Sequence, residues 1–155
     1  MALEESINFL RVNDRVTTSG VVGAKRLSDL GRLGYGVVIN LLPDESEHAV
    51  KNERQIVEEQ GLRYVHIPVD FGRPTLADFD EFDSAMNEAQ EKRVHIHCAA
   101  NYRVTAFYAL YAELGGIWTQ SQGQDFVERL WRPQDHEGWP VLFATVRARA
   151  KTSSE

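Results

Sequence analysis

The sequence contains a single cysteine, Cys98, and this residue stands at a change of pattern. A short apolar run from Val94 leads up to it as a strand would, and an apolar run with helical spacing follows from Thr105. A loop between a strand and a helix directs backbone N–H groups and the positive end of the helix dipole at one small volume. Such a place favours an anion and lowers the pKa of a thiol. We therefore interpret Cys98 as a candidate nucleophile rather than a small core residue.

Arg103 is a candidate for binding the anion that such a loop would attract. It falls in the first turn of the expected helix, where the helix dipole disfavours a cation unless a negative charge lies nearby. The alternative is an ordinary ion pair with Glu45 or Glu47, which occur in an earlier loop.

Asp70 is a candidate general acid because it falls just past an earlier strand pattern. It could also be an ordinary turn residue, and Asp78 and Asp80 are rivals that helix capping and surface exposure already explain. A thiolate, an arginine that holds an oxyanion and an acid that protonates a leaving group are the parts of covalent phosphoryl transfer through a cysteine.

Alternating strand and helix patterns explain how these distant residues meet. The patterns predict strands at residues 15–20, 37–42, 63–70 and 93–98, and helices at 24–33, 46–60, 75–86 and 105–114, with two more within 118–150. This order predicts an α/β fold with a mainly parallel central sheet of about four to five strands flanked by helices. Because ligands bind beyond the carboxyl ends of parallel strands, the loops at 43–47, 70–74 and 98–105 should meet there.

Composition limits the classes of function. With 155 residues and 43% hydrophobic content, we expect one domain over residues 1–155, with a core at about 15–150. The 17 basic residues are outnumbered by 23 acidic ones, so we expect no nucleic-acid partner. A long apolar run and a leader pattern are both lacking, so we expect no membrane partner and a cytoplasmic location.

The pair His97-Cys98, together with Arg103, Thr105 and the upstream Asp70, resembles the cysteine-dependent protein tyrosine and dual-specificity phosphatases. Within that group, residues 16–114 are most similar to small bacterial tyrosine-phosphatase-like proteins, including phosphatase domains related to beta-lactamase-hydrolase-like proteins. The resemblance implies a cysteine-phosphatase-like fold and hydrolysis of phosphate monoesters through a thiophosphoryl-cysteine intermediate. It also implies a phosphorylated protein or small molecule as substrate, and no cofactor.

The resemblance assigns roles by position. Cys98 would be the nucleophile, Arg103 the phosphate clamp, Asp70 the general acid, and Thr105 the hydroxyl that helps the thiolate leave. The residues that would surround the bound phosphate, or a sulfate in its place, are His97, Ala99, Ala100, Asn101, Tyr102 and Val104.

The loop departs from the phosphatase pattern in two ways. Only four residues separate Cys98 from Arg103, where the signature has five, and Asn101 stands where the family has a glycine. Asparagine is the residue other than glycine that best tolerates positive φ. A shorter loop also resembles that of the rhodanese-like sulfurtransferases, in which Cys98 would carry a persulfide. A third alternative is an anion-binding module with weak catalysis.

The histidines have several interpretations. His97 is either a core histidine or a residue that orders the loop and tunes the thiolate. His95 and His97 share one strand face and His66 lies on another strand, which is compatible with a metal site. No carboxylate or second cysteine has ligand spacing, so we expect no metal.

Overall fold

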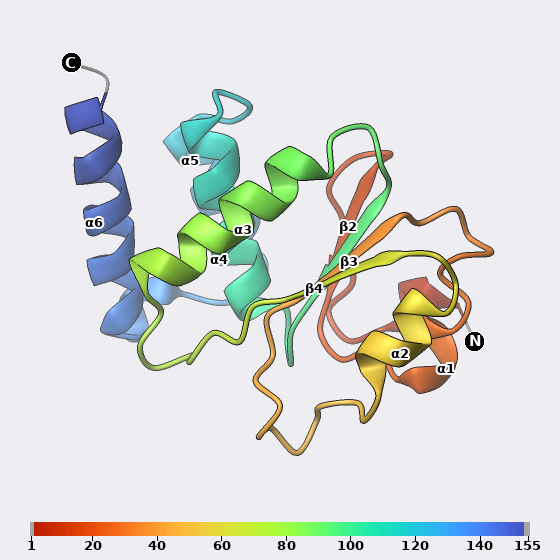
Figure 1. Ribbon diagram of the computed structural model, residues 1–155. Coiled ribbons are helices and arrows are strands. Elements are labelled where there is room, and N and C mark those ends of the chain that lie inside the picture. Colours follow the sequence, from red (N-terminus) through yellow and green to blue (C-terminus); the bar gives the residue numbers. More distant parts are fainter. Residues whose placement is uncertain (1, 154–155) are drawn as a thin grey trace.

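Five strands form one sheet at the centre of the computed structural model, which describes residues 2–153 (Figure 1). The spatial order is β1-β2-β5-β3-β4. β1 is antiparallel to β2, and the other neighbouring strands run parallel. The predicted mainly parallel sheet is therefore confirmed. Residue 1 and residues 154–155 of the expected domain lie outside the described part. The strands are β1 (Leu10–Arg11), β2 (Val16–Ser19), β3 (Val37–Asn40), β4 (Arg63–His66) and β5 (Val94–His97).

The middle strand of the sheet is β5, which leads into Cys98. It pairs with β2 on one side and β3 on the other, so that His97 lies opposite Ser19 and Asn40. All four residues of β5 are buried. Because neighbouring side chains of a strand point to opposite faces, Val94 and Ile96 join one core and the two histidines face the other layer. The strand thus delivers Cys98 to the centre of the carboxyl edge.

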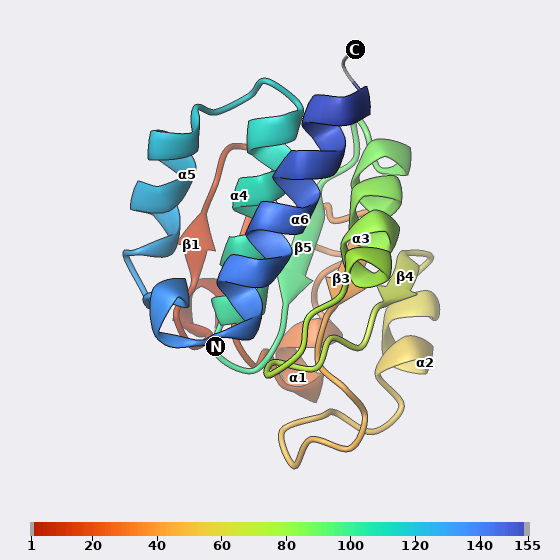
Figure 2. The same cartoon turned by 90° about the vertical axis from the view of Figure 1, so that its left-hand side faces the viewer.

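Helices cover both faces of the sheet. In Figure 1, α3, α4, α5 and α6 lie on one side and α1 and α2 on the other, and Figure 2 shows α6 running alongside α4 and α3. The larger core, which includes Phe107 and Trp139, fills the first side, and a smaller core around Val38 and Val57 fills the second. The helices are α1 (Ala24–Leu27), α2 (Glu53–Glu58), α3 (Leu76–Glu88), α4 (Tyr102–Leu114), α5 (Gln120–Val127) and α6 (Gly138–Ser153), with short 3-10 turns η1 (Leu3–Glu5) and η2 (Pro133–Asp135).

Helix α3 begins as the sequence predicts. The Thr75 hydroxyl accepts from Asp78 N at 3.1 Å, and the Asp78 carboxylate accepts from Thr75 N at 3.1 Å. This reciprocal capping satisfies backbone donors that the first turn of a helix leaves free.

Two predicted helices are much shorter in the structure. The prediction of a helix at 46–60 is wrong for its first seven residues, because α2 starts at Glu53 after the left-handed Asn52 (φ 62°). The Ser46 hydroxyl accepts from His48 N and forms a local turn instead. The helix predicted at 24–33 ends after one turn, at Leu27. Residues 28–34 form turns instead of a longer α-helix, with bonds such as Leu30 N to Leu27 O at 3.3 Å.

Candidate functional site

Cys98 lies directly after β5 and is fully buried. Its backbone N–H donates to Ser19 O at 3.3 Å, and the preceding carbonyl, that of His97, accepts from Leu41 N at 2.9 Å. The main chain is therefore held from both neighbouring strands at the point where it leaves the sheet. The thiol belongs to the larger core, on the face opposite to the His97 side chain.

The loop after Cys98 owes its shape to Asn101, which has left-handed backbone angles (φ 70°, ψ 9°). Its side-chain amide donates to Asn8 O at 2.8 Å and to the Thr18 hydroxyl at 2.9 Å. Asn8 in turn donates from its own amide to Ala100 O at 2.9 Å. The asparagine therefore takes the positive φ expected of a glycine and also ties the loop to the N-terminal segment and β2.

The loop passes close to β2 at Gly20. A Cβ added to Gly20 would lie 2.3 Å from Ala99 O and 2.9 Å from the Ala100 Cα, so a side chain does not fit there. The same carbonyl of Ala99 accepts from Val21 N at 3.0 Å. A glycine is thus required for the backbones of loop and strand end to meet.

The backbone N–H groups of residues 99–104 have no hydrogen-bond acceptor within residues 2–153. The first bond of α4 runs from Thr105 N to Asn101 O at 3.1 Å. The run includes the free donors that begin every helix, and it starts at the residue that follows Cys98. Free backbone donors of this kind are what an anion site requires, and the binding of an anion here stays a prediction.

Arg103 is partly buried and turns toward the loop that contains Asp70. Its Nη1 donates to Val69 O at 3.0 Å, and its guanidinium lies 5.7 Å from the centre of the Phe71 ring. The ion pair with Glu45 or Glu47 that the sequence allowed does not form among the described residues. Within the same set, the buried Nε of Arg103 has no partner. The residue connects α4 with the segment of the candidate acid.

Asp70 is exposed at the same edge of the sheet, four residues after β4 ends. Its carboxylate accepts from Gly72 N at 2.9 Å, so the interpretation as a turn residue is confirmed. Two bonds hold the neighbouring main chain: Val69 N donates to Leu41 O at 3.0 Å, and Trp139 Nε1 donates to Phe71 O at 2.9 Å. The carboxylate is thus carried by a firmly attached turn, and its role as the acid stays a prediction.

Thr105 is fully buried beside the start of α4. Its hydroxyl donates to Tyr102 O at 3.0 Å and accepts from Trp131 Nε1 at 3.1 Å. Trp131 also stacks on Tyr102, with ring centres 5.2 Å apart and nearly parallel planes. The sequence did not indicate that Trp131 contacts Thr105 and Tyr102. Trp131 lies 26 residues beyond Thr105, in a segment without a recognisable motif.

His97 contacts a residue that the sequence analysis missed. Its Nε2 lies 2.6 Å from Glu53 Oε2, and both side chains are buried, with 3% and 5% of their surface exposed. No spacing or composition could reveal this pair, because Glu53 belongs to a polar segment whose helix begins only there. A buried carboxylate is the unexpected feature of this site.

The other two histidines that were considered for a metal site have protein partners. His95 contacts the Thr17 and Ser19 hydroxyls at 2.8 and 2.9 Å, and burial followed by the charge of neighbouring His97 holds the pKa of His95 well below its usual value. His66 donates from Nε2 to Leu42 O, at 2.7 Å. Within residues 2–153 no group of three histidine, cysteine or acidic side chains could hold a metal ion.

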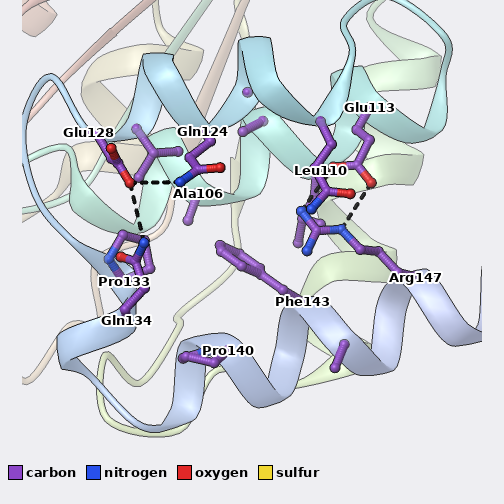
Figure 3. Close-up of a pocket in the computed structure, with 15 residues that line it drawn as sticks. Ala106, Leu110, Glu113, Gln124, Glu128, Pro133, Gln134, Pro140, Phe143 and Arg147 are labelled. Carbon is purple, nitrogen blue, oxygen red and sulfur yellow. Dashed lines mark hydrogen bonds and ion pairs between the residues drawn. The ribbon is translucent and has the colours of Figure 1, made fainter.

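A separate hollow of about 260 Å³ lies between α4, α5 and α6 (Figure 3). Its walls are mainly apolar, with Phe143 pointing into it, and the bidentate pair of Glu113 with Arg147 closes one end. Cys98 and Asp70 are absent from its lining. No helix in the described part of the chain is long and apolar enough to cross a membrane.

Comparisons with known proteins agree with this arrangement. Residues 8–114 match the family described as "Beta-lactamase hydrolase-like protein, phosphatase-like domain". A beta-lactamase hydrolase-like protein of Agrobacterium fabrum is 31% identical over 120 residues, which is 76% of this chain and 28% of that protein. The chain therefore spans about a quarter of the length of the curated relatives it matches.

Solved structures share the whole fold. A DUF442 protein of Shewanella putrefaciens CN-32, described as a candidate phosphatase, is 32% identical with a TM-score of 0.82, covering 95% of this chain and 93% of its own. TpbA of P. aeruginosa, solved in complex with pTyr, has a TM-score of 0.69 at 18% identity, covering 94% of this chain and 91% of its own. The fold is thus that of the cysteine phosphatases, as the resemblance implied.

Proposed function

This chain belongs to the phosphatase-like domain family of beta-lactamase hydrolase-like proteins, and we propose that it hydrolyses phosphate monoesters with Cys98 as the nucleophile. The observation that carries the proposal is the run of backbone N–H groups at residues 99–104, which have no acceptor among the described residues. The run starts next to Cys98 and includes the first turn of α4. Donors fixed in advance around one volume stabilise the oxygens of a phosphoryl group as negative charge moves onto them.

Arg103 completes the anion site in this proposal. Its guanidinium already lies at the edge of the loop and exchanges one carbonyl contact, with Val69 O, for the oxygens of the phosphate. Guanidinium binds phosphate with two parallel hydrogen bonds, which a single carbonyl cannot offer. The main chain of Ala99, Ala100, Asn101, Tyr102 and Val104 forms the remainder of the substrate site. His97, which the resemblance also implied, is buried and its ring contacts Glu53 instead.

The reaction takes two steps. In the first, the Cys98 thiolate attacks phosphorus, the S–P bond forms, the P–O bond of the ester breaks, and Asp70 gives its proton to the leaving oxygen. In the second, water attacks phosphorus, its proton passes to Asp70, and the S–P bond breaks to release inorganic phosphate and the thiolate. Thr105 stabilises the departing sulfur once its hydroxyl proton, which the Tyr102 carbonyl accepts in this structure, turns to the sulfur.

The substrate is a phosphorylated molecule, protein or small, and TpbA in complex with pTyr shows one such group on this fold. Because the reaction needs a reduced thiol, we place it in the cytoplasm. The activity of the complete relatives, of which the match covers about a quarter, is a separate matter.

An aryl phosphate assay near pH 6 tests the proposal. We expect hydrolysis by the wild-type protein, a loss of about a thousandfold or more in Cys98→Ser, and a fall in kcat in Asp70→Asn. Activity that survives in Cys98→Ser contradicts the covalent mechanism.

Because four residues separate Cys98 from Arg103, a rhodanese-like sulfurtransferase is the second candidate function, and a separate assay tests it. Turnover of thiosulfate and cyanide to thiocyanate, with one added sulfur on Cys98, would assign sulfur transfer instead. Binding of phosphate or sulfate without either turnover would assign an anion-binding module.

A further inference from the structure

We infer that Trp131 is a positioning residue for the second step of the reaction, because its indole N–H holds the hydroxyl of Thr105. The inference rests on the proposed function, since it concerns the hydroxyl that helps the Cys98 thiolate to leave. Trp131 Nε1 donates to Thr105 Oγ1 at 3.1 Å, and both side chains are buried. Trp131 lies beyond residues 8–114, over which the chain matches its family, so the contact comes from the C-terminal part of the fold.

The hydroxyl of Thr105 takes part in two hydrogen bonds of different kinds. It donates its proton to Tyr102 O at 3.0 Å, as a helical threonine does toward the preceding turn, and it accepts from Trp131. A hydroxyl has one proton and two lone pairs, so the indole can keep its lone pair while the proton turns. The proton of Thr105 can therefore leave Tyr102 O for the sulfur while the oxygen stays in place.

The bond from Trp131 also makes Thr105 a better donor. A hydroxyl whose oxygen accepts a hydrogen bond is polarised and donates more strongly, and such bonds are strongest in a buried site of low dielectric constant. Thr105 is fully buried and Trp131 is 7% exposed. The sulfur of Cys98 loses its negative charge in the first step and regains it in the second, as the S–P bond breaks. A donor aimed at that charge therefore favours the second step.

Aromatic contacts fix the indole that makes this bond. Trp131 stacks on Tyr102 with ring centres 5.2 Å apart and planes 6° from parallel. The ring of Trp139 meets the indole edge-on with centres 5.4 Å apart, and the centre of the Phe71 ring lies at the same distance. A donor that packing already orients needs no further ordering when the reaction calls on it. The direction of the Trp131 N–H is thus set before a substrate binds.

The variant Trp131→Phe tests this inference, because it removes the N–H and keeps an aromatic ring. Rapid acid quenching during turnover of an aryl phosphate near pH 6 gives the rates at which the thiophosphoryl group on Cys98 forms and decays. We expect the decay to slow about tenfold, so that the phosphorylated protein accumulates, and formation to change by less than about twofold. A general disturbance of the loop would slow both steps equally and would overturn the inference.

A second replacement at the same position keeps the shape of the indole. Benzothienylalanine, introduced at residue 131 by nonsense suppression, has a sulfur atom in place of the N–H. We expect it to slow the decay as much as Trp131→Phe does, although its packing is that of tryptophan. An unchanged rate of decay with this residue would overturn the inference, whatever the smaller ring of phenylalanine does to the fold.

Trp139→Phe is the matched comparison, because Trp139 is another buried tryptophan whose Nε1 donates, in this case to Phe71 O at 2.9 Å. That contact supports the turn of Asp70, which acts in both steps, so we expect formation and decay to slow together. Trp118→Phe should change neither rate, since Trp118 follows the far end of α4. A selective loss of decay in either comparison would show that any lost indole has this effect, and would overturn the inference.

A double-mutant cycle tests whether Trp131 acts through Thr105. Thr105→Val removes the hydroxyl and should slow the decay of the thiophosphoryl group by itself. Trp131→Phe should then add nothing, because the group that the indole positions is already gone. Fully additive effects on the rate of decay would overturn the inference.

The wild-type protein separates this inference from the proposed function. If the wild-type protein hydrolyses no ester, the proposed function fails and the role of Trp131 fails with it. If the wild-type protein forms and hydrolyses the thiophosphoryl group on Cys98, and the decay in Trp131→Phe is equally fast, only the role of Trp131 fails.

Discussion

At the level of single residues, Asn101 determines the shape of the loop by combining positive φ with two donated hydrogen bonds. We predict that Asn101→Ala lowers the free energy of unfolding by about 2–3 kcal/mol, because it loses both bonds and strains the backbone. Asn101→Gly should cost about 1 kcal/mol, because glycine accepts the conformation. Urea denaturation measures both. Equal losses in the two variants would show that backbone strain is unimportant here.

His95 makes the stability depend on pH. Its pKa is depressed in the folded protein from the ordinary value of 6.5, chiefly by burial, whereas in the unfolded chain it takes a proton normally. The unfolded state therefore binds more protons as the pH falls, and stability is lost progressively from about pH 6.5 downward. We predict that wild-type protein loses more unfolding free energy between pH 7 and 5 than His95→Gln does. If the unfolding free energies of the two proteins change with pH in parallel, His95 is not the source of the pH dependence.

The sequence was sufficient for some of these residues and not for others. Cys98 and Arg103 could be placed at the two ends of one loop because the apolar patterns before and after that loop are strong, although α4 begins at Tyr102 and therefore includes Arg103. Glu53 and Trp131 could not be found, because each reaches the site through tertiary packing from a segment whose local pattern is weak. The bonds of Asn101 to Asn8 and Thr18 are likewise long-range.

At the level of elements, the start of α6 holds the turn that carries Asp70. Gly138 packs so closely on this turn that an added Cβ would lie 2.8 Å from Gly72 O and 3.0 Å from the Pro74 ring. We predict that Gly138→Ala displaces the turn and lowers kcat for an aryl phosphate about tenfold, while the affinity for inorganic phosphate stays the same.

Gly36→Ala serves as the comparison for this experiment. Its added Cβ would meet only the flexible side chain of Lys92, at 3.3 Å, and Gly36 comes just before β3, at the far end of the sheet. It should leave kcat unchanged. A normal kcat in Gly138→Ala would mean that the turn tolerates displacement or that Asp70 is not the acid.

β3 was predictable from its almost unbroken apolar run, and α3 because its apolar spacing matches the helical period. The short elements were not. The two-residue β1 has too few positions to show an alternation, and the polar segment before α2 forms turns through its own side chains. The alternation of valine, histidine, isoleucine and histidine in β5 would suggest that one face of the strand is exposed. All four residues are buried, because β5 is the middle strand of the sheet.

At the level of the whole molecule, the helices beyond the family match complete the core. The match ends at residue 114, yet Trp139, Leu142 and Val146 of α6 are buried with the residues that surround Cys98. We predict that Leu142→Ala, at 3% exposure, lowers the free energy of unfolding by about 2–5 kcal/mol. Leu114→Ala, at 38% exposure, should cost less than about 1 kcal/mol. Thermal or urea unfolding measures both variants. An equal loss of unfolding free energy in the two would show that α6 is not part of the core that stabilises the fold.

The central claim is that Cys98 forms a covalent bond to phosphorus. Rapid acid quenching of the wild-type protein during turnover of an aryl phosphate, followed by mass spectrometry of the peptide that contains Cys98, tests it most directly. We predict a peptide heavier by one phosphoryl group, found on Cys98 and missing from Cys98→Ser. Hydrolysis of the ester with an unmodified Cys98 at every quench time, or a phosphoryl group on another residue, would contradict the account.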